Sequence, residues 1–189
     1  EILEGRKTTT WRLFDDKDLQ VGDKVQVEAP AGKITWGDAK QWVLFAGPDI
    51  IEDEGMVLEV GKEIQRVTQK LGIPWVLKCS FDKANRQSSS SFRGPGASAA
   101  LKSLDKIKSA IGAPLLTDVH ETIQVAGTAE VADVIQIPAF LSRQTDLLVE
   151  TAKTGKVIHI KKGQFLAPWD MKAIAQKADE AIPRDAFCG

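Results

Sequence analysis

The stretch KCSFDKANRQSSSSFRGPG, residues 78–96, separates an apolar run from a helical pattern. The apolar run IPWVL, at residues 73–77, predicts a buried strand, and residues 97–111 carry apolar side chains at the spacing of a helix. The stretch between them is therefore a strand-to-helix loop. It is long for such a connection, which is typical of a functional loop.

The charges of this loop favour an anionic ligand. Lys78, Lys83, Arg86 and Arg93 accompany one acid, Asp82, and most other positions carry hydroxyl, amide or glycine groups. Lysine and arginine bind phosphate through charge-assisted hydrogen bonds. A solvated loop with ordinary surface charges is the alternative that the composition leaves open.

The same strand–loop–helix unit recurs from Trp42 onward. Strands are predicted at residues 42–46, 73–77, 114–117, 133–137 and 156–160, with a partial sixth strand at 185–188. Helices are predicted at residues 52–71 and 97–111, from residue 121, and at 143–153 and 168–181. Strict alternation predicts a parallel sheet, but periodicity leaves open the choice between a doubly wound sheet and a barrel.

The first part of the chain has a different character. Residues 1–41 contain short β-prone runs interrupted by Gly-Asp and Pro-Ala-Gly turns, which predict a β-hairpin region. We interpret it as a lid over the closed end of a barrel. The expected domains are therefore an N-terminal β-rich extension, residues 1–41, and a partial barrel domain, residues 42–189.

Length and composition limit the possible classes of protein. The 189 residues suffice for one domain, but a complete eightfold barrel needs about 250. We therefore expect part of a longer protein, beginning here at Glu1 and stopping at Gly189. A net charge of -1 gives no general attraction to nucleic acid or membranes. No apolar run approaches the roughly 20 residues of a bilayer span, and Cys79 and Cys188 are expected as free thiols, so the predicted location is cytoplasmic.

Polar residues lie where the predicted strands end, and ligands bind at these ends in both candidate folds. They are Asp49, Lys78, Lys83, Asp118, His120, Gln136 and Lys161. Lysines that converge repel one another unless an anion neutralises them. This predicts a phosphorylated or carboxylated substrate, and phosphoenolpyruvate carries both groups. A solvated Lys161–Lys162 pair remains an alternative.

Two histidines are candidates for proton transfer. His120 follows Asp118 by two positions, so both side chains leave the same face of the strand end. They could order water or relay protons, although a structural histidine is an equally good reading. His159 lies within a predicted strand and is expected to be structural.

Several short motifs appear in order between Trp42 and Pro168. They are AGP at 46–48, KANR at 83–86, SFRGPG at 91–96, TDVHE at 117–121, QIPAFL at 136–141, RQTDL at 143–147 and KKGQF at 161–165. Together they resemble 3-deoxy-D-manno-octulosonate 8-phosphate (KDO-8-phosphate) synthase. The resemblance implies a (β/α)8 TIM barrel, of which this chain holds about strands 1–5 and the start of strand 6. Such an open half-barrel would leave two sheet edges unpaired and a core face wet.

The resemblance also implies an activity. It is the condensation of phosphoenolpyruvate with arabinose 5-phosphate and water, with release of phosphate. Residues matching Lys83 and Lys161 bind phosphoenolpyruvate, and Lys78, Ser80, Asp118 and Gln136 line the same site. We assign catalytic roles to Lys83, Lys161, Asp118 and His120.

For arabinose 5-phosphate, the resemblance places Asn85 at the sugar and Arg86 at its phosphate. Arg143 matches an arginine that reaches the sugar phosphate of a neighbouring subunit, which implies a homo-oligomer. From the residues alone, Arg143 is equally a surface arginine at a helix start.

Asp49 departs from the family pattern. Its position carries Cys in metal-dependent members and Asn in metal-independent ones. A carboxylate there is a candidate ligand for a divalent ion or an unfavourable neighbour of phosphoenolpyruvate. The expected cofactor is therefore either none or a divalent metal ion.

Three alternative functions remain. A DAHP synthase-type enzyme performs the same condensation with erythrose 4-phosphate, but its loop typically has Pro-Arg where this chain has Ala84-Asn85-Arg86. A Schiff-base aldolase would use Lys161 as a nucleophile. The chain is also compatible with a non-catalytic fragment.

Overall fold

The computed structural model describes residues 10–11, 25–29, 32–36 and 42–183. Its strands are β1 (Thr10–Trp11), β2 (Val25–Ala29), β3 (Gly32–Trp36), β4 (Leu44–Ala46), β5 (Trp75–Lys78), β6 (Leu115–Asp118), β7 (Val134–Ile137) and β8 (Val157–Ile160). Its helices are α1 (Glu54–Leu71), α2 (Ala97–Ile111), α3 (Thr122–Val131), α4 (Thr145–Lys153) and α5 (Met171–Glu180), with short 3-10 turns at Ala139–Leu141 and Pro168–Asp170. The elements predicted between residues 42 and 181 are confirmed. The sixth strand predicted at 185–188 lies outside the described residues.

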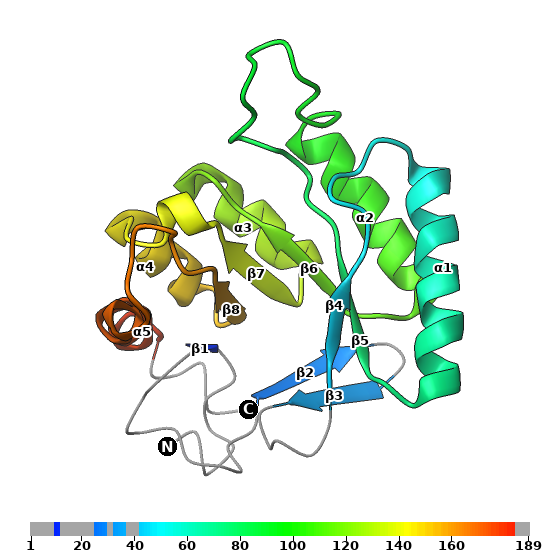
Figure 1. Cartoon of the computed structure of the whole chain (residues 1–189), viewed down its shortest axis with the longest axis horizontal. Coiled ribbons are helices and arrows are strands. Elements are labelled where there is room, and N and C mark those ends of the chain that lie inside the picture. The colour runs from blue at the N-terminus through cyan, green and yellow to red at the C-terminus, as the bar shows by residue number, and fades with distance from the viewer. Residues whose placement is uncertain (1–9, 12–24, 30–31, 37–41, 184–189) are drawn as a thin grey trace.

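The strands from β4 onward form a parallel sheet. Within the described residues the strand order is β1-β8-β7-β6-β5-β4, and β2 and β3 form a separate antiparallel ribbon (Figure 1). Each pair from β4 to β8 is parallel, as strand–helix–strand crossovers require. This architecture is that of part of a (β/α)8 barrel.

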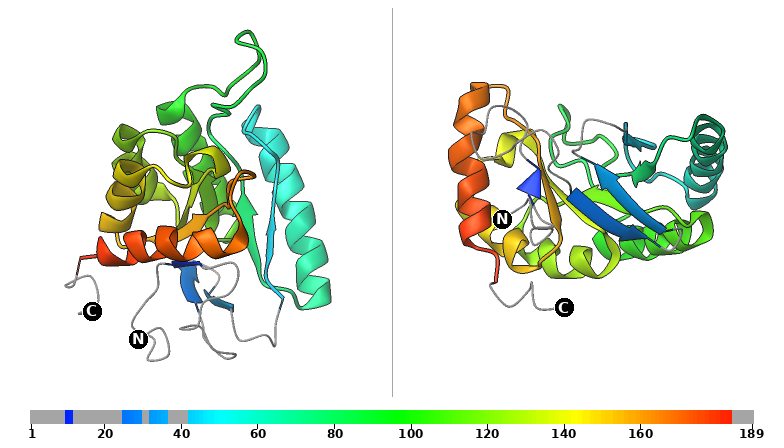
Figure 2. Two further views of the ribbon diagram at one scale, coloured as in Figure 1. Left: turned by 60° about the vertical axis from the view of Figure 1, so that its left-hand side comes forward. Right: turned by 90° about the horizontal axis from the view of Figure 1, so that it is seen from below.

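The helices cover one face of this sheet. Seen from below, α1 to α5 form an arc around the outside, and the β2–β3 ribbon lies within it (Figure 2). The largest core cluster fills the layer between sheet and helices; Leu77, Leu104, Leu115, Ile135 and Ile158 are all fully buried there. Burial of this apolar surface is the main force that holds the helices on the sheet.

The opposite face of the sheet has its own apolar layer. Val76, Leu116, Val134 and Val157 point to this inner face from four adjacent strands, and Ile34 of β3 packs against them. All four of these side chains are buried. The expectation that this face of the sheet would be exposed to solvent is therefore wrong for this layer. The reason is that Ile34, together with Val43 and Phe45, packs against it. The domain boundary after residue 41 stays a prediction, because residues 37–41 are outside the described ranges.

The two edges of the sheet differ. β1 pairs in parallel with β8, Thr10 opposite Ile158 and Trp11 opposite His159, so the expectation of an unpaired edge is wrong there. A strand from early in the chain supplies the backbone partners. At the other edge, no described strand pairs with β4 on its outer side. On that edge strand, Leu44 is 39% exposed.

The longest described helix shows how local sequence sets the boundaries of an element. α1 begins after Asp53, whose carboxylate accepts a hydrogen bond from the Met56 amide at 2.8 Å, and it ends at Gly72 with a φ of 65°. None of the described helices combines the length and the apolar character that a bilayer crossing requires.

Candidate active site

A cavity of about 470 Å³ opens where β4 to β8 end. The predicted site residues that line it are Asp49, Lys78, Lys83, Asn85, Asp118, His120, Gln136 and Lys161. These residues come from the ends of five strands and from the loop after β5. The cavity therefore lies at the carboxyl ends of the strands, where parallel α/β folds bind their ligands.

The alternation of side chains along the strands explains why polar groups meet there. Lys78, Asp118 and Gln136 each stand two residues after a buried apolar residue of the inner face, so they point to that same face. In each strand the earlier residue fills the closed end and the later one reaches the cavity. The site is thus a continuation of the inner core into a polar layer.

Gly47 lets the end of β4 approach β5 closely. A Cβ atom on Gly47 would lie 2.2 Å from the Lys78 carbonyl oxygen and 3.0 Å from Cδ1 of Leu77. Beyond it, Ile50 forms a parallel bridge with Ser80, and the Ile51 amide donates to the Ser80 carbonyl at 3.0 Å. The segment that carries Asp49 is therefore held against the start of the loop after β5.

Lys78 and Asp118 are charged groups of the cavity whose pKa values are shifted by burial and by their neighbours. Burial lowers the pKa of Lys78; nearby Lys83 lowers it further, while Asp118 and Asp49 act in the opposite direction. Burial alone would raise the pKa of Asp118, but hydrogen bonds from His120 and Ser80, together with the charge of Lys78, hold it below its usual value. Asp118 is therefore an ionised carboxylate at neutral pH.

Asp118 and His120 form a hydrogen-bonded pair on the cavity wall. His120 Nε2 lies 3.1 Å from Asp118 Oδ2, and both side chains are less than 10% exposed. The remaining polar atoms, Asp118 Oδ1 and His120 Nδ1, are buried and have no hydrogen-bond partner within the described residues. Buried polar atoms are nearly always paired, so these two are suited to hold a ligand or a water molecule.

Lys83 is paired with Asp49. Its ammonium donates to Asp49 Oδ1 at 2.7 Å and to Ser80 Oγ at 3.0 Å, and its side chain is only 15% exposed. Ser80 itself is fully buried and lies behind Lys83. It therefore positions the lysine and does not line the cavity.

The residues around Asp49 do not fit a divalent metal ion. In the part of the chain that the structure describes, no group of three or more His, Cys, Asp or Glu side chains could hold one. An ammonium group 2.7 Å from Asp49 would also repel a cation bound at the same oxygen. The described residues thus give no support to a metal-ligand role for Asp49.

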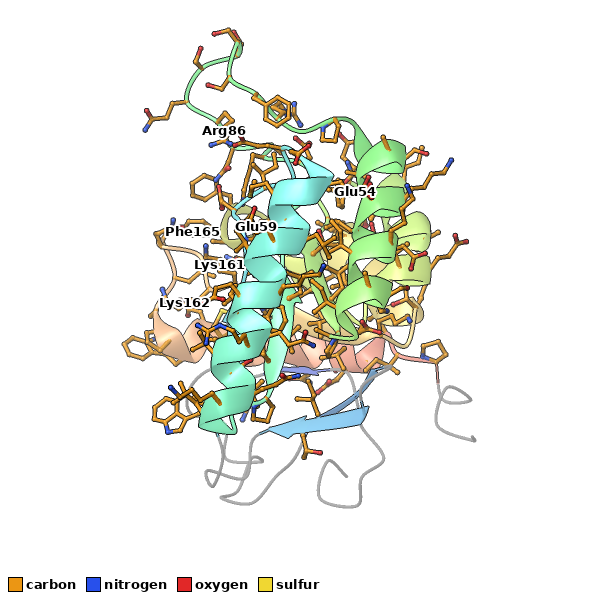
Figure 3. The ribbon with its side chains drawn as sticks, turned by 90° about the vertical axis from the view of Figure 1, so that its right-hand side faces the viewer. Glu54, Glu59, Arg86, Lys161, Lys162 and Phe165 are labelled. Atoms are coloured by element: carbon orange, nitrogen blue, oxygen red, sulfur yellow. The ribbon has the colours of Figure 1, made fainter. Side chains whose placement is uncertain are left out.

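Two predicted residues lie outside the cavity. Arg86 is exposed on the loop after β5, where its Nε donates to the Phe92 carbonyl at 3.1 Å. Figure 3 shows it near the base of that loop, apart from Lys161, which follows β8. Arg143 lines a different hollow, together with Phe165 and Trp169.

The cavity also contains residues to which the sequence assigned no role. Pro138 and Phe140 come from the segment after β7, and Gln164 follows β8. All three belong to motifs quoted for the family resemblance. Their position directly after a strand was the signal that could have identified them.

His159 lies within a strand, but its neighbours include residues of the cavity. Its ring stacks on Phe45 at a centroid distance of 6.0 Å, and it stands opposite Gln136 in the sheet. Burial, with smaller contributions from Lys78 and Lys161, lowers its pKa to about 4. The expected structural role is compatible with this position on the inner face.

This depressed pKa predicts a pH-dependent stability. Between about pH 6.5 and pH 4, His159 binds a proton in the unfolded chain but stays neutral in the folded chain. The contribution of neutral His159 to the free energy of unfolding is therefore fully present above pH 6.5 and is lost as the pH falls toward 4. We expect the free energy of unfolding of the unaltered protein to fall about 2–3 kcal/mol further than that of His159→Gln between pH 7.5 and 4.5. Urea unfolding at both pH values measures this; parallel losses would contradict it.

Comparison with known proteins identifies the family of this chain. The sequence pattern of the DAHP synthetase I family matches residues 18–183. A 2-dehydro-3-deoxyphosphooctonate aldolase of Pseudomonas fluorescens is 55% identical over 150 residues, which are 79% of this chain and 53% of that protein. The proteins of the same name from Ectopseudomonas mendocina and Fusobacterium nucleatum are 56% and 52% identical, over 75% and 79% of this chain and 50% and 54% of their own lengths.

The chain spans about half the length of the curated relatives that it matches. The matched part includes the strands whose ends form the cavity. Because the family pattern covers most of the sequence, the chain belongs to the DAHP synthetase I family.

Proposed function

We propose that this chain forms the phosphoenolpyruvate-binding part of a 3-deoxy-8-phosphooctulonate synthase, which condenses phosphoenolpyruvate with arabinose 5-phosphate and water and releases phosphate. The observation that carries the proposal is the convergence of Lys78, Lys83 and Lys161 on one cavity. Three ammonium groups, from the end of β5, the loop after it and the end of β8, suit a small molecule that bears both a phosphoryl and a carboxylate group. The name shared by the relatives supports the same reaction.

The proposed roles follow from the position of each group. Lys83 and Lys161 hold the anionic groups of phosphoenolpyruvate, and Lys78 adds positive charge from the inner wall. Asp118 orients His120, whose free ring nitrogen holds the reacting water. Preorganised charge and positioning then lower the barrier, without a covalent bond to the protein.

The sugar phosphate is proposed to bind across the mouth of the cavity. Asn85 lines that mouth, whereas Arg86 and Arg143 lie outside the cavity and are exposed. We propose that Arg86 turns toward the sugar phosphate when it binds, and that Arg143 acts on a neighbouring copy in a cytoplasmic homo-oligomer. Both arginines have a planar fork that suits a phosphate group.

Two measurements test the proposal. Calorimetry with phosphoenolpyruvate tests the cavity: we expect binding by the purified chain, and a folded chain that does not bind would overturn the assignment. Phosphate release is then followed with arabinose 5-phosphate or erythrose 4-phosphate as the second substrate. Release with arabinose 5-phosphate supports the synthase, and release with erythrose 4-phosphate alone supports the DAHP synthase-type reaction.

A second candidate, a non-catalytic fragment that retains the phosphoenolpyruvate site, has support of its own. Within the described residues β4 is paired on one side only, and the two arginines expected at the sugar phosphate are not part of the cavity. This candidate predicts phosphoenolpyruvate binding without phosphate release from either sugar phosphate.

A further inference from the structure

The position of Asp49 at the mouth of the cavity is not explained by the proposed reaction. Its carboxylate lies 2.7 Å from the Lys83 ammonium, the group proposed to hold an anion of the substrate. The Asp49 side chain is 70% exposed, whereas Lys83 is 15% exposed. A solvent-facing acid therefore covers the accessible side of an enclosed lysine.

The backbone holds this acid in place. The close approach of Gly47 to the Lys78 carbonyl and the bridge between Ile50 and Ser80 lie on either side of Asp49. On the other side of the pair, Ser80 Oγ accepts a hydrogen bond from Lys83 at 3.0 Å. Both partners are thus anchored by the pairing of the β4 and β5 segments, so the ion pair is a built feature of the site.

The charges of the cavity show what this pair does to a ligand. Lys78, Lys83 and Lys161 are the lysines of the lining, and Asp49 and Asp118 are its acids. Asp118 is enclosed beside Lys78 and His120, whereas Asp49 faces the opening. A phosphoryl group that approaches Lys83 meets the Asp49 carboxylate at the same ammonium, and two like charges at one cation repel each other.

We infer that Asp49 is an internal counter-ion of Lys83 that an anionic ligand must displace, which makes Asp49 a specificity-determining residue of the cavity. The carboxylate swings into solvent when a phosphoryl group takes its place on the lysine. The site thereby selects ligands whose anionic group binds Lys83 more strongly than a carboxylate does, such as a doubly charged phosphate monoester. This inference rests on the proposed anion site at Lys83.

The test compares Asp49→Asn with the unaltered chain, with inorganic phosphate and phosphoenolpyruvate as probes in calorimetry. Asparagine keeps the size of the side chain and one acceptor oxygen, removes the negative charge and replaces the other oxygen by an NH2 group. We expect both probes to bind about tenfold more tightly to Asp49→Asn, as the loss of one like charge at a partly screened site predicts. The matched control is Glu150→Gln, which removes the carboxylate of an exposed ion pair with Lys153 on α4. It should leave both affinities unchanged.

The remaining outcomes are equally decisive. Equal or weaker binding by a folded Asp49→Asn, while the unaltered chain binds phosphate, would overturn the counter-ion role and leave the proposed function standing. Titration with Mn²⁺ is a second arm: Mn²⁺ binding that is lost in Asp49→Asn would make the carboxylate a metal ligand and also overturn the inference. If neither protein binds either anion, the proposed function fails, and the inference fails with it.

Discussion

Lys83→Ala is expected to lower the affinity for phosphoenolpyruvate at least about 30-fold, since loss of one member of an enclosed charge pair typically costs about 2–5 kcal/mol of binding free energy. Lys83 lies on the loop after β5, and its ammonium group bonds to both Asp49 and Ser80. Its removal also leaves Asp49 at the mouth without a counter-ion, so the variant combines a lost attraction with a new repulsion. Calorimetry with phosphoenolpyruvate measures the effect.

A matched control separates this loss from a change in total charge. Lys153→Ala removes a lysine that pairs with Glu150 at 3.1 Å on the exposed face of α4, and it should bind phosphoenolpyruvate like the unaltered protein. Thermal unfolding shows whether each variant is folded. Unchanged affinity in a folded Lys83→Ala would refute both the anion site and the function proposed from it.

Gly47→Ala is expected to reduce the free energy of unfolding by about 1–3 kcal/mol, the usual range for forced overpacking. The added Cβ would stand 2.2 Å from the Lys78 carbonyl oxygen, which is backbone and cannot move aside without separating β4 from β5. The same displacement moves Lys78 and Asp49, so phosphoenolpyruvate binding should weaken together with stability. Urea unfolding and calorimetry measure the two effects.

Gly127→Ala is the matched control for this substitution. Gly127 lies within α3, and a Cβ there would meet no atom within 4 Å. Alanine forms helix better than glycine, so this variant should gain up to about 1 kcal/mol of stability. Equal stabilities for Gly47→Ala and the unaltered protein would show that the close contact between β4 and β5 is not needed.

The strands and the polar residues at their ends could be predicted because both depend on local patterns. Apolar runs bounded by glycine and proline indicated the strands, and the position of Lys78, Asp118 and Gln136 at the ends of those strands indicated that they would meet, as they do in the cavity. The positions of Arg86 and Arg143 could not be predicted in this way. A loop side chain takes its direction from contacts such as the hydrogen bond from Arg86 to the Phe92 carbonyl, which no periodicity encodes.

The same limit applied to the sheet edges and to Asp49. Pairing of β1 with β8 joins segments that are far apart in the chain, and the expectation of a free edge failed for that reason. For Asp49 the sequence left two readings, a metal ligand and a like-charge neighbour of the substrate. The choice between them depends on the Lys83 ammonium, whose position follows from the bridge between Ile50 and Ser80.

Local order along this chain was thus enough to establish alternating strands and helices, the strand-end lysines and the family likeness. The strands and helices follow from hydrogen bonding and side-chain alternation within a few residues, and the likeness follows from short motifs. The ion pair of Asp49 with Lys83, the covering of the inner apolar layer by Ile34 and the exclusion of Arg86 from the cavity arise from folding in three dimensions. They depend on distances between segments remote in sequence, which are set by packing of the whole sheet and its helices.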